Sequence, residues 1–460
     1  MIPTGATESS LYCFKAWMRL ALAVTPVCAQ DAAETLVGGA ADQPPETAIS
    51  GDDSLCPVWG GFRTRLSDHG FDYSVTYIGE VLGNVAGGIE RGVIYEGLLK
   101  AQVDFDTAKL GAWPSGAFHG SALYPHGEGL SEKYLGDLFT LSNIDAPDAV
   151  CLFELWYEHQ FGALSLRVGQ LAADEEFAFT DYGAVFINGT VGWPAIIALN
   201  APTPAYPLAT PGVRLAANLG GGWSLQTAVY NGDPCPEDSN GNELNPHGVY
   251  WSFQDAFVIA ELKREWHREA DAAGLPGQAK LGGWYHTGQF DHQRLDDTGL
   301  PLSDPASTGQ PLQVQGNWGL YLTVEQQLWR EPAADPASDQ GVGVFARFGG
   351  SPGDRNPLEY YAEGGVTCTG LLPGREADVC GVAVVYGQMS HDARQLAEEC
   401  NCTSAYAGPL PDYEMVVEAT YRVAVRPGFT TQPVAAYVIH PGGSAGGDAL
   451  VLGLRFNLDF

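Results

Sequence analysis

Three consecutive acidic residues, Asp174, Glu175 and Glu176, are the first candidates for chemistry in this sequence. A pair of carboxyl groups can supply the acid and the base of glycoside hydrolysis. That reaction needs the two groups on opposite sides of a sugar, and neighbouring positions in a chain do not indicate such a separation. We therefore favour a role for Glu175 and Glu176 in holding or shaping a loop.

The other reactive side chains do not form a catalytic or metal-binding pattern. His119, His126 and His159 lack the spacing of metal ligands. Cys400 and Cys402 are separated by one residue and have no neighbouring histidine, which also argues against a metal site. Because no nucleophile and base converge in the sequence, we predict no enzyme, no metal and no cofactor.

The elements that would position these residues are clearest at the C-terminus. The last strand-like segment alternates strictly and ends the chain on Phe460. A period of two indicates a strand with one apolar and one polar face. A transmembrane β-barrel explains this pattern best, because its strands turn an apolar face to lipid and a polar face to the lumen. The alternating apolar residues are Leu450, Leu452, Leu454, Phe456, Leu458 and Phe460.

Turn-forming residues divide the rest of the chain into similar segments. Their number is about sixteen, which is the size class of diffusion porins. We therefore predict an all-β, antiparallel transmembrane barrel. The predicted strands are Phe71–Gly83, Tyr95–Asp106, Gly116–His126, Cys151–Phe161, Ala163–Leu171, Gly212–Leu219, Gly222–Asn231, Gln254–His267, Gln278–Phe290, Gln315–Trp329, Gly341–Gly350, Leu358–Gly370, Asp378–Met389, Tyr413–Val425, Phe429–His440 and Asp448–Phe460.

The N-terminus has the pattern of an exported protein. Residues 1–29 contain the basic residues Lys15 and Arg19, a short apolar core and a small-x-small cleavage site, which predicts a signal peptide. Residues 30–55 are rich in Ala, Asp, Glu, Pro and Gly, so we predict a flexible acidic leader. The barrel domain then comprises residues 56–460.

The chain is strongly acidic, with 23 Lys and Arg against 55 Asp and Glu and a formal net charge of -32. Such a surface repels the phosphates of nucleic acid, so we predict no nucleic-acid partner. The acidity fits acidic external loops, and it also fits a channel that prefers cations. Both interpretations stay open at this point.

Seven of the nine cysteines follow the predicted signal peptide. The exported compartment is oxidising, so disulfides can form there. Cys368 and Cys380 flank a turn-rich segment and could clip a hairpin. The odd number leaves at least one thiol free or paired outside the chain.

The longest connection, Ala172–Pro211, is unusually apolar and aromatic for a loop. Folding into the barrel would bury it and narrow the pore. Glu175 and Glu176 would then lie at the constriction. Trp193 is the best aromatic candidate for stacking on a sugar ring, and it is equally well explained as an anchor that packs the loop onto the wall.

Charged residues on or next to strands are further candidates for the pore lining. Glu96 and Lys100 share the polar face of one predicted strand. Arg167 and Arg347 lie in mid-strand, where lipid is a poor host for a guanidinium group. Arg91 precedes a strand and could project into the lumen, although an ordinary rim arginine explains it somewhat better.

These segments together resemble the carbohydrate-selective porin family of the OprB type. The resemblance runs from about residue 55 to the C-terminus, and the order and spread of short matches carry it. The matching segments are Trp59-Gly60-Gly61, Gly79-Glu80, Arg167-Val168-Gly169-Gln170, Glu175-Glu176-Phe177, Thr210-Pro211-Gly212, Gly341 to Gly349, Asp354-Arg355-Asn356-Pro357, Pro411-Asp412-Tyr413-Glu414, His440-Pro441-Gly442-Gly443 and Gly453-Leu454-Arg455.

The resemblance implies passive uptake of sugars through the outer membrane of a Gram-negative bacterium, often by a homotrimer. The expected partners are carbohydrate solutes, outer-membrane lipid and, through Phe460, the barrel assembly machinery. The family covers several solutes, so no particular sugar is implied. The alternative is a general or cation-preferring porin without sugar selectivity, and the charges predicted for the lumen disfavour a soluble lectin-like protein.

Overall fold

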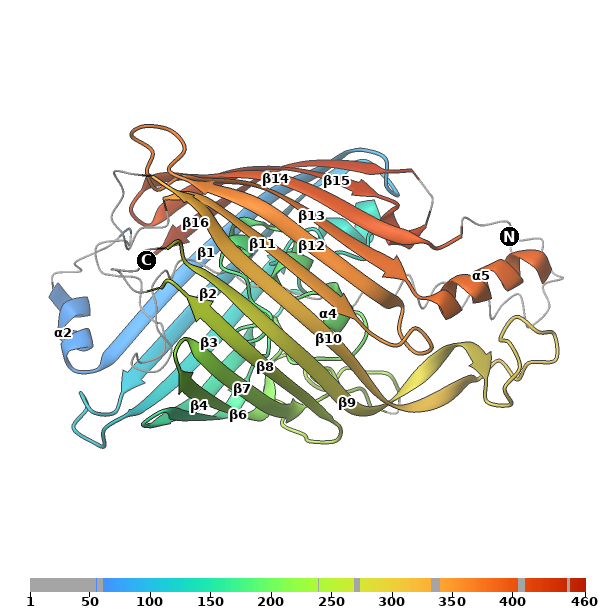
Figure 1. Ribbon diagram of the computed structural model, residues 1–460, viewed down its shortest axis with the longest axis horizontal. Coiled ribbons are helices and arrows are strands. Elements are labelled where there is room, and N and C mark those ends of the chain that lie inside the picture. The colour runs from blue at the N-terminus through green and yellow to red at the C-terminus, as the bar shows by residue number, and fades with distance from the viewer. Residues whose placement is uncertain are drawn as a thin grey trace.

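The computed structural model describes residue 55 and residues 61–238, 240–268, 274–331, 340–403, 410–444 and 447–460. These residues form a closed barrel of sixteen strands (Figure 1). Every strand pairs antiparallel with its neighbours in sequence, and β1 (Phe71–Ala86) closes the barrel against β16 (Ala449–Asp459). The predicted fold class is confirmed. The predicted signal peptide and nearly all of the predicted leader lie outside the described residues.

The strand bounds follow the alternation of the sequence closely. Two strands, β4 (Cys151–Phe161) and β11 (Gly341–Gly350), begin and end at the predicted residues. The other strands are β2 (Gly92–Asp106), β3 (Gly116–Gly127), β5 (Leu164–Leu171), β6 (Thr210–Gly220), β7 (Trp223–Asn231), β8 (Ala256–Trp266), β9 (Gly277–Asp296), β10 (Pro311–Arg330), β12 (Leu358–Thr369), β13 (Val379–Met389), β14 (Tyr413–Arg426) and β15 (Phe429–Ile439).

Alternate residues of each strand face outward and inward, as the C-terminal strand illustrates. Leu454 points outward and is 46% exposed, whereas the neighbouring Arg455 points inward and is 4% exposed. Leu450 and Leu452 lie on the same outer face as Leu454. An apolar exterior around a polar interior is the arrangement that a lipid-embedded barrel requires. Among the described residues, no helix is long and apolar enough to cross a membrane.

The two ends of the barrel differ. At the turn end, short connections such as residues 162–163, 221–222 and 427–428 join the strands. The helix α2 (Phe62–Asp68) and the C-terminus also lie at this end (Figure 1). The long connections, residues 128–150, 172–209, 232–255 and 390–412, gather at the opposite loop end. This asymmetry is the one expected of a porin.

A projecting arm at the loop end differs from the prediction. Strands β9 and β10 are 20 residues each and extend well past the predicted ends, so part of the expected loop 291–314 is a hairpin. Helix α5 (His391–Thr403) packs against this hairpin, and Arg294 donates to Glu399 over 2.7 Å. The extension carries few apolar residues because it lies beyond the apolar belt, so alternation did not reveal it.

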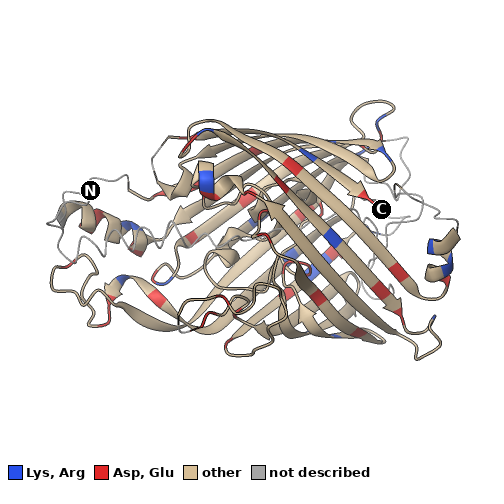
Figure 2. Cartoon of the chain, turned by 180° about the vertical axis from the view of Figure 1, so that it is seen from behind, with Lys and Arg blue, Asp and Glu red and all other residues tan. Residues whose placement is uncertain are grey.

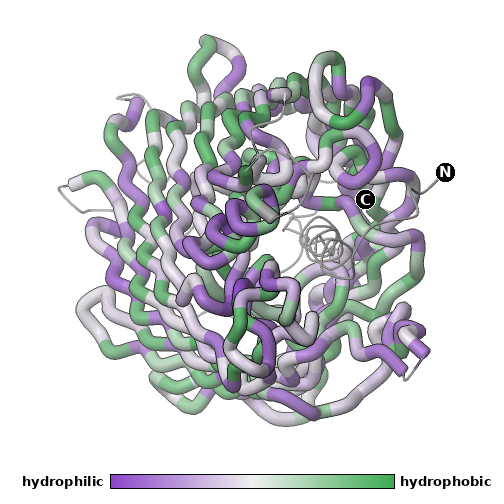
Figure 3. The backbone as a smooth tube through the Cα atoms, turned by 90° about the vertical axis from the view of Figure 1, so that its right-hand side faces the viewer, coloured by the Kyte–Doolittle hydropathy of each residue, from purple (hydrophilic) through white to green (hydrophobic). Residues whose placement is uncertain are grey.

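The interior of the barrel holds chain that folds in from the loop end (Figure 3). Two connections enter: residues 128–150, with a π-helical turn at Ser131–Leu135, and residues 172–209. The second contains short helical turns at Tyr182–Val185, Gly189–Gly192 and Ala195–Ala198. Their apolar side chains form the main core with inward residues of the wall.

The cysteines behave differently from the prediction at one position. Cys368 and Cys380 lie directly opposite each other on β12 and β13, but both thiols are free. The predicted hairpin clip is therefore wrong for this structure, in which the strand ladder and the bond from Gly370 N–H to Asp378 O (2.9 Å) close the hairpin. Cys400 is disulfide-bonded.

Candidate functional site

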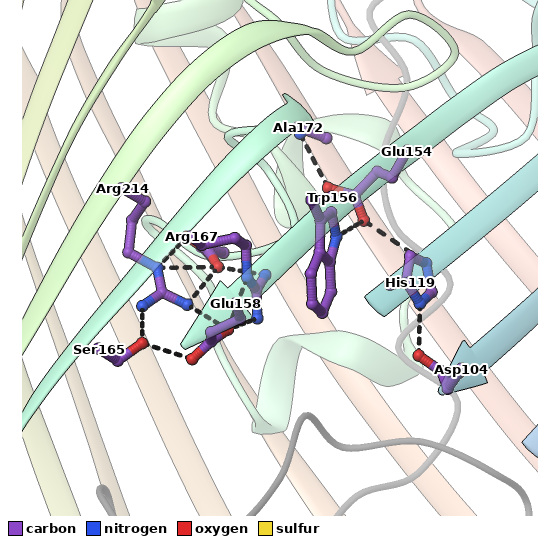
Figure 4. Close-up of polar contacts among 10 residues, drawn as sticks. Asp104, His119, Glu154, Trp156, Glu158, Ser165, Arg167, Ala172 and Arg214 are labelled. Carbon is purple, nitrogen blue, oxygen red and sulfur yellow. Dashed lines mark hydrogen bonds and ion pairs between the residues drawn. The ribbon is translucent and has the colours of Figure 1, made fainter. Parts of the chain in front are cut away.

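A strip of charged side chains lines the inner face of neighbouring strands β4, β5 and β6. The strand register places Glu158 beside Arg167, and Arg167 beside Arg214. Two arginines at directly opposite positions repel each other unless carboxylates separate them. Glu158, which lies between the two arginines in Figure 4, and Glu176 supply that compensation. Glu176 comes from the inward loop 172–209.

The contacts within this strip are those of charge-assisted hydrogen bonds. The Arg214 guanidinium donates from Nε to Glu176 Oε2 over 3.0 Å and from Nη2 to Glu158 Oε2 over 3.1 Å. Its Nη1 donates to Ser165 Oγ over 2.7 Å. Arg167 Nε donates to Glu158 Oε2 over 2.7 Å. Because two arginines balance two glutamates, the strip carries no net charge.

An aromatic residue, Trp156, joins this strip to a second polar group. The Arg167 guanidinium lies 3.7 Å from the indole centroid, and the His119 ring stacks at 4.9 Å with an interplanar angle of 16° (Figure 4). His119 Nδ1 lies 2.7 Å from Asp104 Oδ1, and its Nε2 lies 3.9 Å from Glu154 Oε2. Trp156 is therefore covered by a cation and a ring, and it serves to align its neighbours.

The electrostatics of the loop differ from one carboxylate to the next. Burial alone would raise the pKa of Glu176, but the guanidinium groups of Arg167 and Arg214 outweigh it and hold this pKa below its usual value. Burial, and then the charge of Glu175, raise the pKa of Asp174 well above its usual value. Asp174 accepts a hydrogen bond from Tyr206 N–H over 2.9 Å, which ties the start of the loop to its end.

The structure brings four of the predicted residues together near this strip. Arg167 and Glu176 belong to it. Lys100 Nζ and Glu175 Oε1 lie 3.4 Å apart, and their side chains are 15% and 28% exposed. Lys100 on β2 and Glu175 on the loop thus keep more contact with the lumen than the arginines do.

The other four predicted residues lie elsewhere. Arg91 is exposed in the connection between β1 and β2 at the loop end. Glu96 is buried on the inner face of β2, opposite Glu80 of β1. Arg347 and Trp193 are 0% exposed. Arg347 forms an ion pair with Glu363 at 3.1 Å and donates to Val191 O over 3.2 Å, while Trp193 Nε1 donates to Thr203 Oγ1 over 3.1 Å.

The burial of Trp193 favours the anchor interpretation over contact with a solute. Several residues of the strip and of the polar group next to it were not predicted, although their alternation was visible. Glu154, Trp156 and Glu158 occupy every second position of a segment whose bounds were predicted correctly. Arg214 could not be selected from the sequence, because only the register across β5 and β6 places it beside Arg167.

The described residues contain no group of His, Cys, Asp or Glu that could hold a metal ion. Two short sequences, Gly349-Gly350-Ser351-Pro352-Gly353 and Gly442-Gly443-Ser444-Ala445-Gly446, match the nucleophile elbow of hydrolases. That elbow requires a turn from a strand into a helix. Ser351 instead follows β11, and the next element of the chain is the strand β12. Ser444 follows a short 3-10 turn, Pro441–Gly443, in the connection between β15 and β16.

A closed antiparallel barrel with a polar interior, narrowed by loops that fold inward, defines the class of the porins. The carbohydrate-selective porin, OprB family, matches residues 90–460, so the chain belongs to that family. It is 27% identical to Porin B of Pseudomonas aeruginosa over 426 residues, which covers 87% of this chain and 90% of Porin B.

Solved structures of a relative agree with this assignment. The high-pH structure of Pseudomonas putida OprB superposes with a TM-score of 0.77 at 25% identity, covering 90% of this chain and all of that one. The low-pH structure of the same protein gives a TM-score of 0.54 at 17% identity, which shows the shared fold. The predicted family resemblance is confirmed.

Proposed function

We propose that this chain is an outer-membrane porin through which sugars or similar small polar solutes diffuse passively. The observation that carries the proposal is the compensated charge of the lumenal strip. Hydroxyl groups both donate and accept hydrogen bonds, and the strip presents guanidinium donors beside carboxylate acceptors. A neutral polyol can exchange one contact for the next without a charge penalty, and weak contacts in series suit permeation.

The family supports the same solute class. Its description names carbohydrate selectivity, and Porin B and the Pseudomonas putida OprB are the similar proteins named above. The loop 172–209 would set the size limit, and Lys100 and Glu175 form a partly exposed ion pair that a solute could reach beside the strip. No chemical step is needed, because the solute moves down its own gradient.

A general or cation-preferring porin is the second candidate. The net charge of -32 favours it, because acidic residues around a pore raise the local concentration of cations. Figure 2 shows acidic residues in the loops as well as in the barrel, where basic residues lie near them. The balance of charge at the strip favours neutral solutes over this alternative.

The remaining expectations concern the setting of the channel. We propose that residues 1–29 direct export and are removed, and that the apolar exterior contacts the lipid of a Gram-negative outer membrane. We also propose a homotrimer, which the family resemblance supports, and recognition of Phe460 by the barrel assembly machinery. Catalysis plays no part in the proposal.

Conductance of the refolded protein in planar bilayers, titrated with neutral mono- and disaccharides, tests the proposal. Stepwise channels whose ion current falls saturably with a sugar are the expected result. Channels that are strongly cation-selective and unaffected by any sugar would favour the general porin. A protein that forms no channels and stays soluble without detergent would refute both.

A further inference from the structure

Two glutamates on one strand hold the chain that fills the barrel. Glu414 and Glu418 lie four residues apart on the inner face of β14, and both are buried. Glu414 accepts hydrogen bonds from Leu138 N–H over 2.8 Å and from Phe139 N–H over 2.8 Å. It also accepts one from Gly442 N–H over 2.7 Å.

Glu418 has the same role for the other inward loop. It accepts hydrogen bonds from the N–H groups of Ile187 and Asn188, each over 2.9 Å. Glu414 therefore holds loop 128–150, whereas Glu418 holds loop 172–209. A buried carboxylate that accepts two or three backbone N–H groups satisfies donors that would otherwise lack a partner inside the barrel.

The two loops are also bonded to each other next to these glutamates. Asn188 Nδ2 donates to Phe139 O over 3.1 Å, and Gly189 N–H donates to Thr140 O over 2.8 Å. A third bond runs from Asn143 N–H to Ile187 O over 2.8 Å. The loops thus form one two-part insert, and β14 is the wall to which both parts are attached side by side.

Other wall glutamates hold loop 172–209 at single points. Glu261 accepts from Ala178 N–H over 2.9 Å, and Glu325 accepts from Tyr182 N–H over 3.0 Å. These contacts fix the first part of the loop. Around Ile187 and Asn188, where the second loop joins, Glu418 is the glutamate that holds the loop. On either side, Gln432 Nε2 donates to Val185 O over 2.6 Å and Arg347 Nη2 donates to Val191 O over 3.2 Å.

We propose that Glu414 and Glu418 are the positioning residues that fix the cross-section of the pore, by fastening both inward loops to β14. Removing either carboxylate leaves buried N–H groups without an acceptor, so the attached loop moves toward water and the passage widens. The inference rests on the proposed function for the size limit of solutes, but the ion current tests it independently of any sugar.

The experiment compares single-channel conductance in potassium chloride for wild type, E414A and E418A. Leaving a buried N–H group without an acceptor shifts an equilibrium by about a factor of ten. Loss of the two bonds to Glu418 should therefore raise the population of a wider, higher-conductance level about a hundredfold. Liposome swelling with sugars of increasing size should show a raised size limit for the same variants.

Glu265→Ala is the matched control. Glu265 lies on the same side of β8 as Glu261 and forms ion pairs with Lys263 and Arg268 at 3.4 Å and 3.7 Å. The E265A channel should have the conductance level and the size limit of the wild-type channel. E418Q keeps the shape of the side chain and one acceptor oxygen, so it should fold and give an intermediate result, even if E418A does not fold.

The outcomes separate the inference from the proposed function. A wild-type channel that conducts ions but ignores sugars would count against sugar passage, while a wider level in E418A would still support the positioning role. Folded E414A and E418A channels with wild-type conductance and size limit would overturn it, as would an equal widening in E265A. Protease cleavage between residues 172 and 209 in E418A, but not in wild type, gives a second supporting readout.

Discussion

Substitution of Arg214 is the sharpest test of the compensated strip, because it changes both the net charge of the strip and the hydrogen bonds that hold the strip together. In Arg214→Ala, Arg167 remains as the cation facing Glu158 and Glu176, and the strip passes from no net charge to one negative charge. The variant also removes the hydrogen bonds from Arg214 to Glu176, Glu158 and Ser165.

The loss of stability expected for R214A follows from the burial of the side chains that Arg214 contacts. The side chains of Arg214 and Glu176 are 7% and 11% exposed. Breaking a buried ion pair by removing one partner costs about 3–5 kcal/mol, since the other charge stays buried. We expect a loss of that order in the free energy of unfolding, seen as a lower temperature at which the barrel loses its resistance to SDS.

The selectivity assay measures the reversal potential across a bilayer with unequal potassium chloride on its two sides. R214A should shift the reversal potential toward that of a cation-selective channel. R214K keeps the positive charge but loses the planar fork, so it should retain wild-type selectivity with only part of the stability. A folded R214A channel with wild-type reversal potential and stability would refute the idea that the strip balances its own charge.

Three further predictions address the lumen, the first inward loop and the lipid face. Lys100→Ala should shift selectivity toward cations and weaken any block by sugars, but barely change thermal stability, because a partly exposed pair with Glu175 contributes about 0–1 kcal/mol; a large loss of stability in the melting assay would contradict this. Burial raises the pKa of Asp137 to about 7, so the folded barrel loses stability as the pH rises above the ordinary aspartate pKa. Asp137→Asn removes this ionisation and should stabilise the barrel more at about pH 8 than at about pH 4. An equal gain at both pH values would count against the pKa shift. Leu454→Arg puts a charge on the lipid face and should cost about 2–4 kcal/mol in refolding titrations, whereas Thr430→Arg on the inner face should cost much less; similar costs would mean that the faces are assigned wrongly.

The strands could be predicted from the sequence because each carries its own signal. An apolar residue at every second position is required wherever one face meets lipid, so the alternation is local and needs no knowledge of neighbours. The bounds of β4 and β11 were predicted without error for this reason. The arm formed by β9, β10 and α5 was missed because chain outside the apolar belt has no such requirement.

The candidate site was predictable only in part. Alternation indicates that Lys100 and Arg167 face inward, and the apolar, aromatic composition of loop 172–209 indicates that this loop folds into the barrel. Neither observation tells which charges meet. The pairing of Arg167 with Glu158 and Arg214 depends on the register of three strands.

What the sequence determined by itself is the class of fold, the inward and outward faces of the strands and the family. What only the tertiary structure decided is the filling of the barrel. Trp193 and Arg347 are residue types that often line pores, yet both are fully buried, Trp193 within loop 172–209 and Arg347 against that loop. Loop 128–150, which Glu414 holds inside the barrel, carries no local sequence pattern that predicts this position. The physical reason is that a strand needs an apolar side chain at each position that faces lipid, and this requirement is visible in its own sequence. A loop inside a barrel is instead placed by hydrogen bonds to residues hundreds of positions away.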